Sequence, residues 1–450
     1  MINFRDRYSA LTKLFNKQPY RKIWTLSWPT ILSNLTVPLL GAVDTAVMGH
    51  LPDASYIGGV AIGSMIFSFV YWGFGFLRMG TVGFVAQAKG SKNLNEIRAV
   101  LVRVLLIGIS ISLVLLFLQD VIKYFSFMLI VGEVKVESFA EKYFDIRIWG
   151  APATLANYGL LGWLLGMQYV RTALVIQLFI NSLNIFLDLF FVFNLNWGVE
   201  GVALATALAQ YSGFILGLIL ILLKINEIGG KWERSLIFDK TALSLTIKVN
   251  RDIFLRTLAL ILSWSLVTWT SAGLGTTVLA VNAILMNFQS FLAHGLDGFA
   301  SATSALVGES LGARDKRGLR RNVISATIMA VIVAGIYTIV YLIAGNTLIA
   351  LFTNINELRD YSSNYLVWIF LSPLISVWSY QLDGVFIGAT LSKEMRNAML
   401  LSAIIYGSCI SILPYEFGNH GIWLSVMIFM VVRAITLICY YPRVEKLITK

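Results

Sequence analysis

The chain has 450 residues, of which 57% are hydrophobic and 13% are charged. Soluble domains carry about 25% charged residues, and the mean hydropathy here is +0.76, so composition excludes an ordinary soluble protein and indicates an integral membrane protein. The formal net charge of +11 would also suit nucleic-acid binding, but the positions of the basic residues give it another explanation.

The predicted elements begin with a basic arm and continue as long apolar segments. The arm, residues 1–23, has no apolar core of its own, so we expect no cleavable signal. Each later segment has about the 20 residues that cross a bilayer as a helix, without the alternation of a barrel strand. The segments are 24–49, 56–79, 99–119, 140–166, 172–195, 198–223, 252–273, 277–306, 323–344, 361–389, 397–414 and 421–441. The sequence therefore predicts an all-α integral membrane protein with twelve transmembrane helices and a tail at 442–450.

The basic residues set the orientation of these helices. If the N-terminus is inside, 29 of the 35 Lys and Arg residues lie in cytoplasmic segments and five lie in outer ones. Cytoplasmic loops of membrane proteins carry such an excess, so we expect both termini in the cytoplasm of a bacterium and a multi-pass protein of its plasma (inner) membrane. The remaining residue, Arg433, is expected to extend to the inner headgroups. Nucleic acid is not needed to explain the charge.

An internal repeat relates the two halves of the chain. The stretch VAQAKGSKN at 85–93 aligns with VGESLGARD at 307–315, and YGLLGWLLG at 158–166 aligns with YQLDGVFIG at 380–388. Both alignments have an offset of 222 residues. Because one offset holds at two distant places, we interpret the chain as a duplication.

The repeat predicts two lobes. Six spans are an even number, so the two repeats are parallel and related by an axis along the membrane normal. We expect a lobe at 24–223, a cytoplasmic linker at 224–251 and a second lobe at 252–441, with a pseudo-twofold axis and a central cleft. This arrangement is typical of alternating-access transporters; the alternatives are a duplicated channel and a structural membrane protein.

Several polar residues fall at one depth in the first lobe. Asp44 lies in the outer third of the first span, and Asn184 and Asp188 lie one turn apart in the fifth. Thr206 in the sixth span returns to that level, and Asn181 is nearby. Two carboxylates, an amide and a hydroxyl can hold a proton or offer oxygen ligands to Na⁺. The alternative for Asp44 is an interfacial residue near a helix end.

Other candidates are weaker. Pro29 and Pro38 in the first span each remove a helix hydrogen bond and permit a bend, although a static kink is the alternative. Asp297 and Asp383 fall toward the inner ends of spans 8 and 10, either as ligands of ion or substrate or as residues of a wet cleft. No metal-binding spacing, catalytic constellation or P-loop is evident, so we expect no enzyme, no nucleotide and no cofactor other than a coupling H⁺ or Na⁺.

Several motifs resemble one family of transporters. LGAVDTAVMGHL, VAQAKG, LLGWLLGMQ, NSLNIFLDLFFV and GVEGVALATALAQ are similar to segments of the multidrug and toxic compound extrusion (MATE) family, and GWLLGMQ and QLDGVFIGAT resemble its DinF-like branch. The resemblance implies twelve helices in two lobes that export amphipathic, often cationic, compounds in exchange for H⁺ or Na⁺. It also implies a cation site at Asp44, Asn184, Asp188 and Thr206, and a bending proline at Pro29.

The sequence departs from another branch of this family, in which the seventh span carries an acid for Na⁺ coupling. The stretch IFLRTLALILSWSLVTWTSAGL of span 7 has no acid, so a site wholly in the second lobe is disfavoured. A flippase of lipid-linked oligosaccharides, from the same wider superfamily, is the alternative function. It would need cations facing the cleft, for which Lys142 and Arg147 are the chief candidates, and the carboxylates favour the exporter. We expect a monomer in contact with membrane lipid and small substrates.

Overall fold

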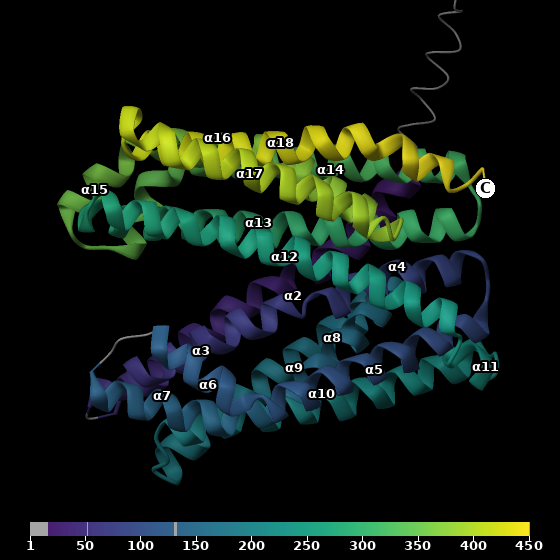
Figure 1. Ribbon diagram of the computed structural model, residues 1–450, viewed down its shortest axis with the longest axis horizontal. Coiled ribbons are helices and arrows are strands. Elements are labelled where there is room, and N and C mark those ends of the chain that lie inside the picture. The colour runs from purple at the N-terminus through teal and green to yellow at the C-terminus, as the bar shows by residue number, and fades with distance from the viewer. Residues whose placement is uncertain (1–16, 52, 130–132, 450) are drawn as a thin grey trace, which may run out of the picture. The chain divides into compact units, whose positions relative to one another are not determined.

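The computed structural model describes residues 17–51, 53–129 and 133–449, which are helical apart from short connections (Figure 1). The helices of the first half are α2 (Lys17–Gly49), α3 (Ser55–Gly73), α4 (Phe76–Gly90), α5 (Leu94–Phe117), α6 (Gln119–Leu129), α7 (Val134–Arg147), η1 (Ile148–Gly150), α8 (Ala151–Gly166), α9 (Val170–Leu189), η2 (Phe190–Asn194) and α10 (Val199–Ile228). Those of the second half are α11 (Arg234–Ile237), α12 (Lys240–Leu274), α13 (Thr276–Gly312), α14 (Lys316–Phe352), α15 (Asn356–Ser363), α16 (Leu366–Gly388), α17 (Ser392–Phe417) and α18 (Asn419–Lys446).

Each predicted span coincides with one long helix or with consecutive helices, which confirms the all-α membrane class. Within the described residues, nine helical segments are long and apolar enough to cross a membrane, or ten if α15 and α16, bent by 49°, form one span. The other two predicted spans are α2 and the interrupted run of α7, η1 and α8. Helix α6, which follows the third span, was not predicted.

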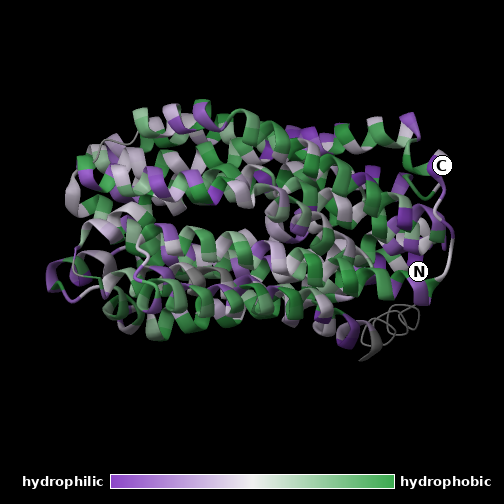
Figure 2. Cartoon of the chain, turned by 90° about the horizontal axis from the view of Figure 1, so that it is seen from below, coloured by the Kyte–Doolittle hydropathy of each residue, from purple (hydrophilic) through white to green (hydrophobic). Residues whose placement is uncertain are grey.

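The surface of the helices is apolar, as a membrane requires. Large hydrophobic side chains such as Phe117, Trp269 and Ile343 are 76% to 86% exposed, which would be costly in water but suits lipid. Figure 2 shows hydrophobic residues along the helices and hydrophilic ones mainly near their ends.

The helices pack into two units, which are described separately. One unit comprises Leu32–Ile247, and the other comprises Lys248–Lys450 together with the residues up to Ile31. Both points at which the chain passes between the units therefore lie inside helices, α2 and α12. The predicted lobes instead had their boundaries at the ends of spans.

The first half of α2 joins the C-terminal unit through specific contacts. Lys22 pairs with Glu309 at 2.8 Å, and the Trp24 ring lies 6.4 Å from the Phe299 ring. Gly298 permits the close approach of α2, because a Cβ atom there would lie 3.1 Å from the Ser27 carbonyl oxygen. The sequence repeat did not predict that the first half of α2 packs in the C-terminal unit.

The repeat is visible in the backbone of both units. Positive φ angles occur at three pairs of positions separated by 222 residues: Lys92 and Arg314, Gln168 and Thr390, Asn196 and Gly418. The helix caps repeat as well, because the Asn93 side chain accepts from the Glu96 amide and the Asp315 side chain accepts from the Gly318 amide. Such local agreement confirms that the two halves repeat one structure.

The glycines of the repeat serve the same helix crossing in each unit. An added Cβ at Gly162, Gly166, Gly384 or Gly388 would meet the carbonyl oxygen of Arg78, Val82, Ala300 or Ser304, respectively. The four carbonyl groups are related by the same offset as the glycines. Thus α8 packs on α4 as α16 packs on α13, with glycine at each close approach.

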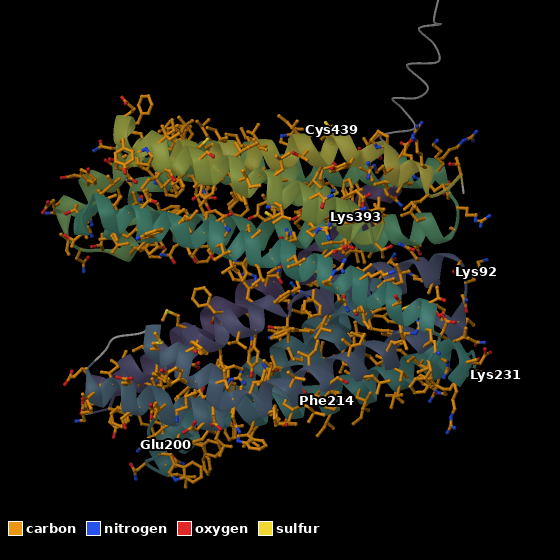
Figure 3. All side chains as sticks on the ribbon, viewed as in Figure 1. Lys92, Glu200, Phe214, Lys231, Lys393 and Cys439 are labelled. Atoms are coloured by element: carbon orange, nitrogen blue, oxygen red, sulfur yellow. The ribbon has the colours of Figure 1, made fainter. Side chains whose placement is uncertain are left out.

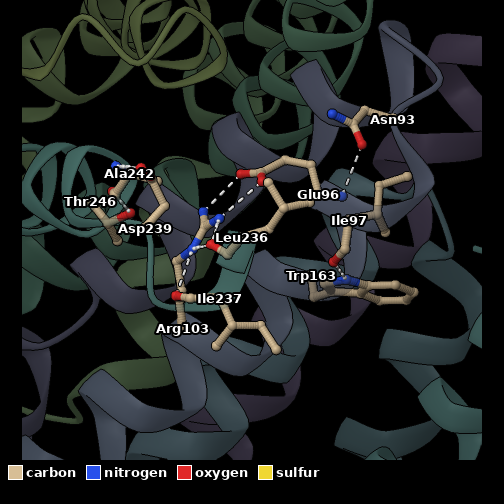
Figure 4. A network of polar contacts seen from close by, with 10 residues as sticks. All are labelled: Asn93, Glu96, Ile97, Arg103, Trp163, Leu236, Ile237, Asp239, Ala242 and Thr246. Atoms are coloured by element: carbon tan, nitrogen blue, oxygen red, sulfur yellow. Dashed lines mark hydrogen bonds and ion pairs between the residues drawn. The ribbon is translucent and has the colours of Figure 1, made fainter. Parts of the chain in front are cut away.

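The segment between the sixth and seventh spans is folded onto α5 rather than extended. Buried Arg103 donates to both carboxylate oxygens of Glu96, at 2.7 and 2.9 Å, and to the carbonyl oxygen of Leu236 at 2.6 Å (Figure 4). Arg98 donates to the carbonyl oxygens of Ile225 and Gly229. These bonds hold the start of the predicted linker against its own unit, and α12 already begins at Lys240.

Candidate functional site

Two buried carboxyl groups meet in the N-terminal unit. Asp44 comes from the last turns of α2 and Asp188 from the last turn of α9, and they are 8% and 0% exposed. Their carboxyl groups lie within hydrogen-bonding range of each other. Two acceptors at this separation need a proton or a cation between them, because two ionised carboxylates repel strongly in a buried site.

An amide and a hydroxyl group complete the cluster. The side chain of Asn184, one turn before Asp188, donates to Thr206 Oγ1 at 3.3 Å. The Thr206 hydroxyl donates to the Val202 carbonyl oxygen at 2.9 Å. The four residues predicted from their depth, Asp44, Asn184, Asp188 and Thr206, are therefore assembled from α2, α9 and α10.

The cluster is rich in acceptors that lack donors. Asp44 Oδ1, Asn184 Oδ1 and both carboxylate oxygens of Asp188 are buried without a hydrogen-bond donor among the residues that the structure describes. Buried acceptors are normally satisfied, and each one that is not costs about 1–3 kcal/mol. We call these four residues the acceptor cluster. Its chemistry suits a proton or a small hard cation.

The neighbouring candidates have different surroundings. Asn181 donates to Thr36 Oγ1 at 2.8 Å and accepts from Gln177 at 3.0 Å, so it links α9 to α2 beside the acceptor cluster. Pro29 is buried in α2, two residues before the chain passes between the units. Pro38 lies in α2, but its side chain is outside the described part of the structure.

One residue near the acceptor cluster was not predicted as part of it. Arg147, at the end of α7, is 7% exposed, and its guanidinium carbon lies 5.5 and 5.3 Å from the ring centres of Phe67 and Tyr71. It acts electrostatically on Asp44. Sequence reasoning considered Arg147 only as a cation of a flippase. Its position as a basic residue in the outer part of a span was the feature of the sequence that could have indicated a place near Asp44.

Lys142, the other cation considered for a flippase, lies at the outer surface predicted for this unit. It pairs with Glu200 at 3.1 Å. Figure 3 places Glu200 at the opposite end of the unit from Lys92 and Lys231, two residues predicted to be cytoplasmic. The pair borders a cavity of about 520 Å³. Its lining consists of Tyr56, Phe139, Lys142, Ile146, Asn196, Trp197, Gly198, Glu200 and Leu204.

The acids of the C-terminal unit are placed differently. Asp383 accepts from both Arg256 of α12 and Arg433 of α18 through its Oδ2 atom, and all three residues are buried. Asp297 is exposed and acts electrostatically on Arg256. An arginine of the seventh span thus contacts Asp383, and two guanidinium groups already bind the oxygen that could serve a cation.

The expectation that Arg433 extends to the inner headgroups is wrong. Arg433 is 2% exposed, and its guanidinium group binds Asp383 and lies 5.8 Å from the Tyr380 ring centre. Asp383 compensates the guanidinium charge of Arg433, which would otherwise be a costly unpaired charge inside the unit. Among the described residues, no group of three or more His, Cys, Asp and Glu could hold a metal ion.

Comparisons with known proteins are consistent with this architecture. Residues 29–190 and 253–411 match the family model described as MatE. The chain is 40% identical over 425 residues to the DNA damage-inducible protein F of Escherichia coli (strain K12), covering 94% of this chain and 92% of that protein. It is 22% identical to a probable multidrug resistance protein NorM of Bacillus anthracis, covering 91% and 92%. A crystal structure of MATE in the bent conformation superposes with a TM-score of 0.85 at 18% identity, covering 95% of this chain and 96% of that one.

Proposed function

The chain belongs to the MatE family, and from that premise we propose that it is a secondary exporter of amphipathic, often cationic, drugs or toxic compounds. The observation that carries the proposal is the acceptor cluster, with its two adjacent buried carboxyl groups. An inward gradient of H⁺ or Na⁺ supplies the energy, and the cluster binds the coupling cation.

Antiport follows if cation and substrate favour different states of the protein. One cation neutralises the carboxyl pair and removes the repulsion between Asp44 and Asp188. The state of lower charge packs more easily in a membrane than the ionised one. A substrate that binds better to the ionised state is then released when the cation arrives. The buried proline of α2, Pro29, supplies a place where this helix can bend.

The substrate class is supported by the acids and by the aromatic cavity. Lipophilic cations are attracted by carboxylates and by aromatic faces. The cavity near Tyr56 presents three aromatic side chains beside an ion pair, which suits an amphipathic molecule. We place the protein in the inner membrane of a bacterium, as a monomer with both termini in the cytoplasm.

The flippase alternative is less well supported. A flippase would use free cations to bind pyrophosphate, but Lys142 is paired with Glu200 and Arg147 acts on Asp44. Lys142 is thus balanced by an acid. The exporter remains the better proposal.

The test is efflux of a cationic dye from proteoliposomes, with a pH gradient and a Na⁺ gradient imposed separately. At least one gradient should drive efflux from liposomes that contain the wild-type protein, and Asp44→Asn should abolish it. A broad panel of dyes that shows no efflux under either gradient would argue against drug export.

A further inference from the structure

The cavity at the predicted outer end of the N-terminal unit holds two opposite charges. Its volume is about 520 Å³, and its lining comes from α3, α7, α10 and the connection after η2. The Lys142 ammonium group and the Glu200 carboxylate pair there at 3.1 Å, with side chains 52% and 39% exposed. An ion pair so open to solvent contributes little to stability. A ligand can therefore replace either partner of this pair at small cost.

Three aromatic side chains lie along the same cavity. The rings of Tyr56 and Phe139 stack at 4.4 Å, and Gly198 lets Tyr56 come close, since a Cβ atom there would lie 2.7 Å from the Cε1 atom of Tyr56. The Lys142 ammonium nitrogen lies 5.8 Å from the centre of the Phe139 ring. The third side chain, Trp197, is 43% exposed. Aromatic faces attract ammonium groups, and Trp and Tyr gather at the level of the lipid headgroups, so this lining suits an ammonium group at the membrane interface.

Opposite charges side by side favour a ligand that carries both signs. A ligand with a single charge would satisfy Lys142 or Glu200 and leave the other without its partner. A zwitterion gives each of them a partner, because its phosphate accepts from Lys142 and its ammonium group donates to Glu200. Two ion pairs then replace one. A purely anionic ligand such as pyrophosphate is disfavoured here, since Glu200 would repel it.

We propose that this cavity binds the headgroup of a zwitterionic phospholipid of the phosphoethanolamine class, from the leaflet on the predicted outer side. The cavity volume lies within the range of about 300–1,000 Å³ that is typical of small-molecule sites. Leu195 and Trp197, on either side of Asn196 in the lining, are 41% and 43% exposed, and apolar surface beside the headgroup suits acyl chains. The proposal goes beyond the proposed function, because it concerns a bound lipid and not the exported compound.

The experiment measures lipid binding to the purified full-length protein by native mass spectrometry. The probes are dioleoyl phosphatidylethanolamine and dioleoyl phosphatidylglycerol, which share acyl chains and a phosphate and differ in the ammonium group. The wild type should bind phosphatidylethanolamine about tenfold more tightly than phosphatidylglycerol. Lys142→Met should lower the affinity for phosphatidylethanolamine about tenfold, because the phosphate loses its partner. Glu200→Gln should bind the two lipids equally, because no carboxylate then pairs with the ammonium group.

The matched control is Lys123→Met. Lys123 pairs with Asp145 at 2.9 Å on the same predicted outer side, and neither residue lines the cavity. This variant should bind both lipids as the wild type does. Lipid bound elsewhere on the protein is common to all the variants, so the difference between them reports the cavity. If Lys142→Met does not fold, Lys142→Gln replaces it.

Three results would overturn the proposal. They are a wild type that binds the two lipids equally, a Glu200→Gln protein that still prefers phosphatidylethanolamine, and a Lys123→Met protein that loses as much affinity as Lys142→Met. Soluble phosphoethanolamine should not displace the lipid at equal concentration; displacement would assign the cavity to a free zwitterion and overturn the lipid. Because the assay needs no gradient, its failure would leave the proposed exporter intact.

Discussion

Replacing either carboxyl group of the acceptor cluster by an amide should stop coupled transport without unfolding the protein. Asp44→Asn and Asp188→Asn preserve size and remove one ionisable group from the pair. At an effective dielectric constant of 20, two unit charges about 4 Å apart repel by about 4 kcal/mol, which is about a thousandfold in an equilibrium constant. The second ionisation is therefore strongly disfavoured once the first has occurred, and this repulsion is what a coupling cation relieves.

Both single variants should reduce gradient-driven dye efflux to the level of empty liposomes. The double variant should be little worse than either single one, because the two residues act as one unit and their effects are not additive. Each variant should elute from gel filtration as the wild type does, since an amide removes repulsion and adds a donor to the cluster. Wild-type efflux by Asp44→Asn, with the protein inserted and monodisperse, would refute the reasoning.

Three further predictions concern stability, pH and topology. Asn282 donates to Ser271 and Asn419 and accepts from Trp423 inside the C-terminal unit, so Asn282→Leu should destabilise it by about 1–3 kcal/mol in a thermal-shift assay; an unchanged melting temperature would contradict this. The Lys135 ammonium group lowers the pKa of the partly exposed Asp53 carboxyl to about 2, so the stabilising pair persists above about pH 4 and is lost as pH falls toward 2. Carboxyl labelling against pH should show the pKa of Asp53 rising toward its ordinary value in Lys135→Ala, although the Ser55 amide still donates to this carboxylate, and an unchanged profile would count against the pair. Cysteine at position 53 should react with an impermeant reagent added outside and cysteine at position 231 should not; the reverse pattern would invert the orientation.

The spans and the acceptor cluster could be predicted because both depend on depth along helices. Counting residues from the end of a span locates Asp44, Asn184, Asp188 and Thr206 at one level, and helical spacing puts two of them on one face. The repeat was equally accessible, since the glycines that permit the crossing of α8 and α4 leave a pattern in the sequence. The spans, the depth of the acceptor cluster and the repeat all follow from positions along the sequence, so the structure agrees with them and adds little.

The rotation of each helix about its own axis could not be predicted from the sequence. The surroundings of Arg433 and Arg147 depend on this rotation, so their contacts were not predicted. Arg433 is a single basic residue in an apolar segment, and Arg147 lies five residues after Lys142 in another. Nothing in the sequence shows whether either arginine faces lipid or the interior. The structure turns Arg433 toward Asp383 and buries Arg147 against the rings of Phe67 and Tyr71. The packing of the first half of α2 in the C-terminal unit could not be predicted either, because it depends on contacts between residues far apart in sequence, such as Lys22 with Glu309.

The chain passes between the two units at two places, and the backbone differs between them. At both places, in α2 and in α12, the polypeptide is continuous helix. A helix keeps its backbone hydrogen bonds across such a point, whereas a loop would not. The elements are unequal, because Pro29 weakens α2 close to its crossing and α12 has no proline anywhere. Helix α12 thus has no proline to interrupt its hydrogen bonds, whereas α2, the helix that carries Asp44, has one two residues before its crossing.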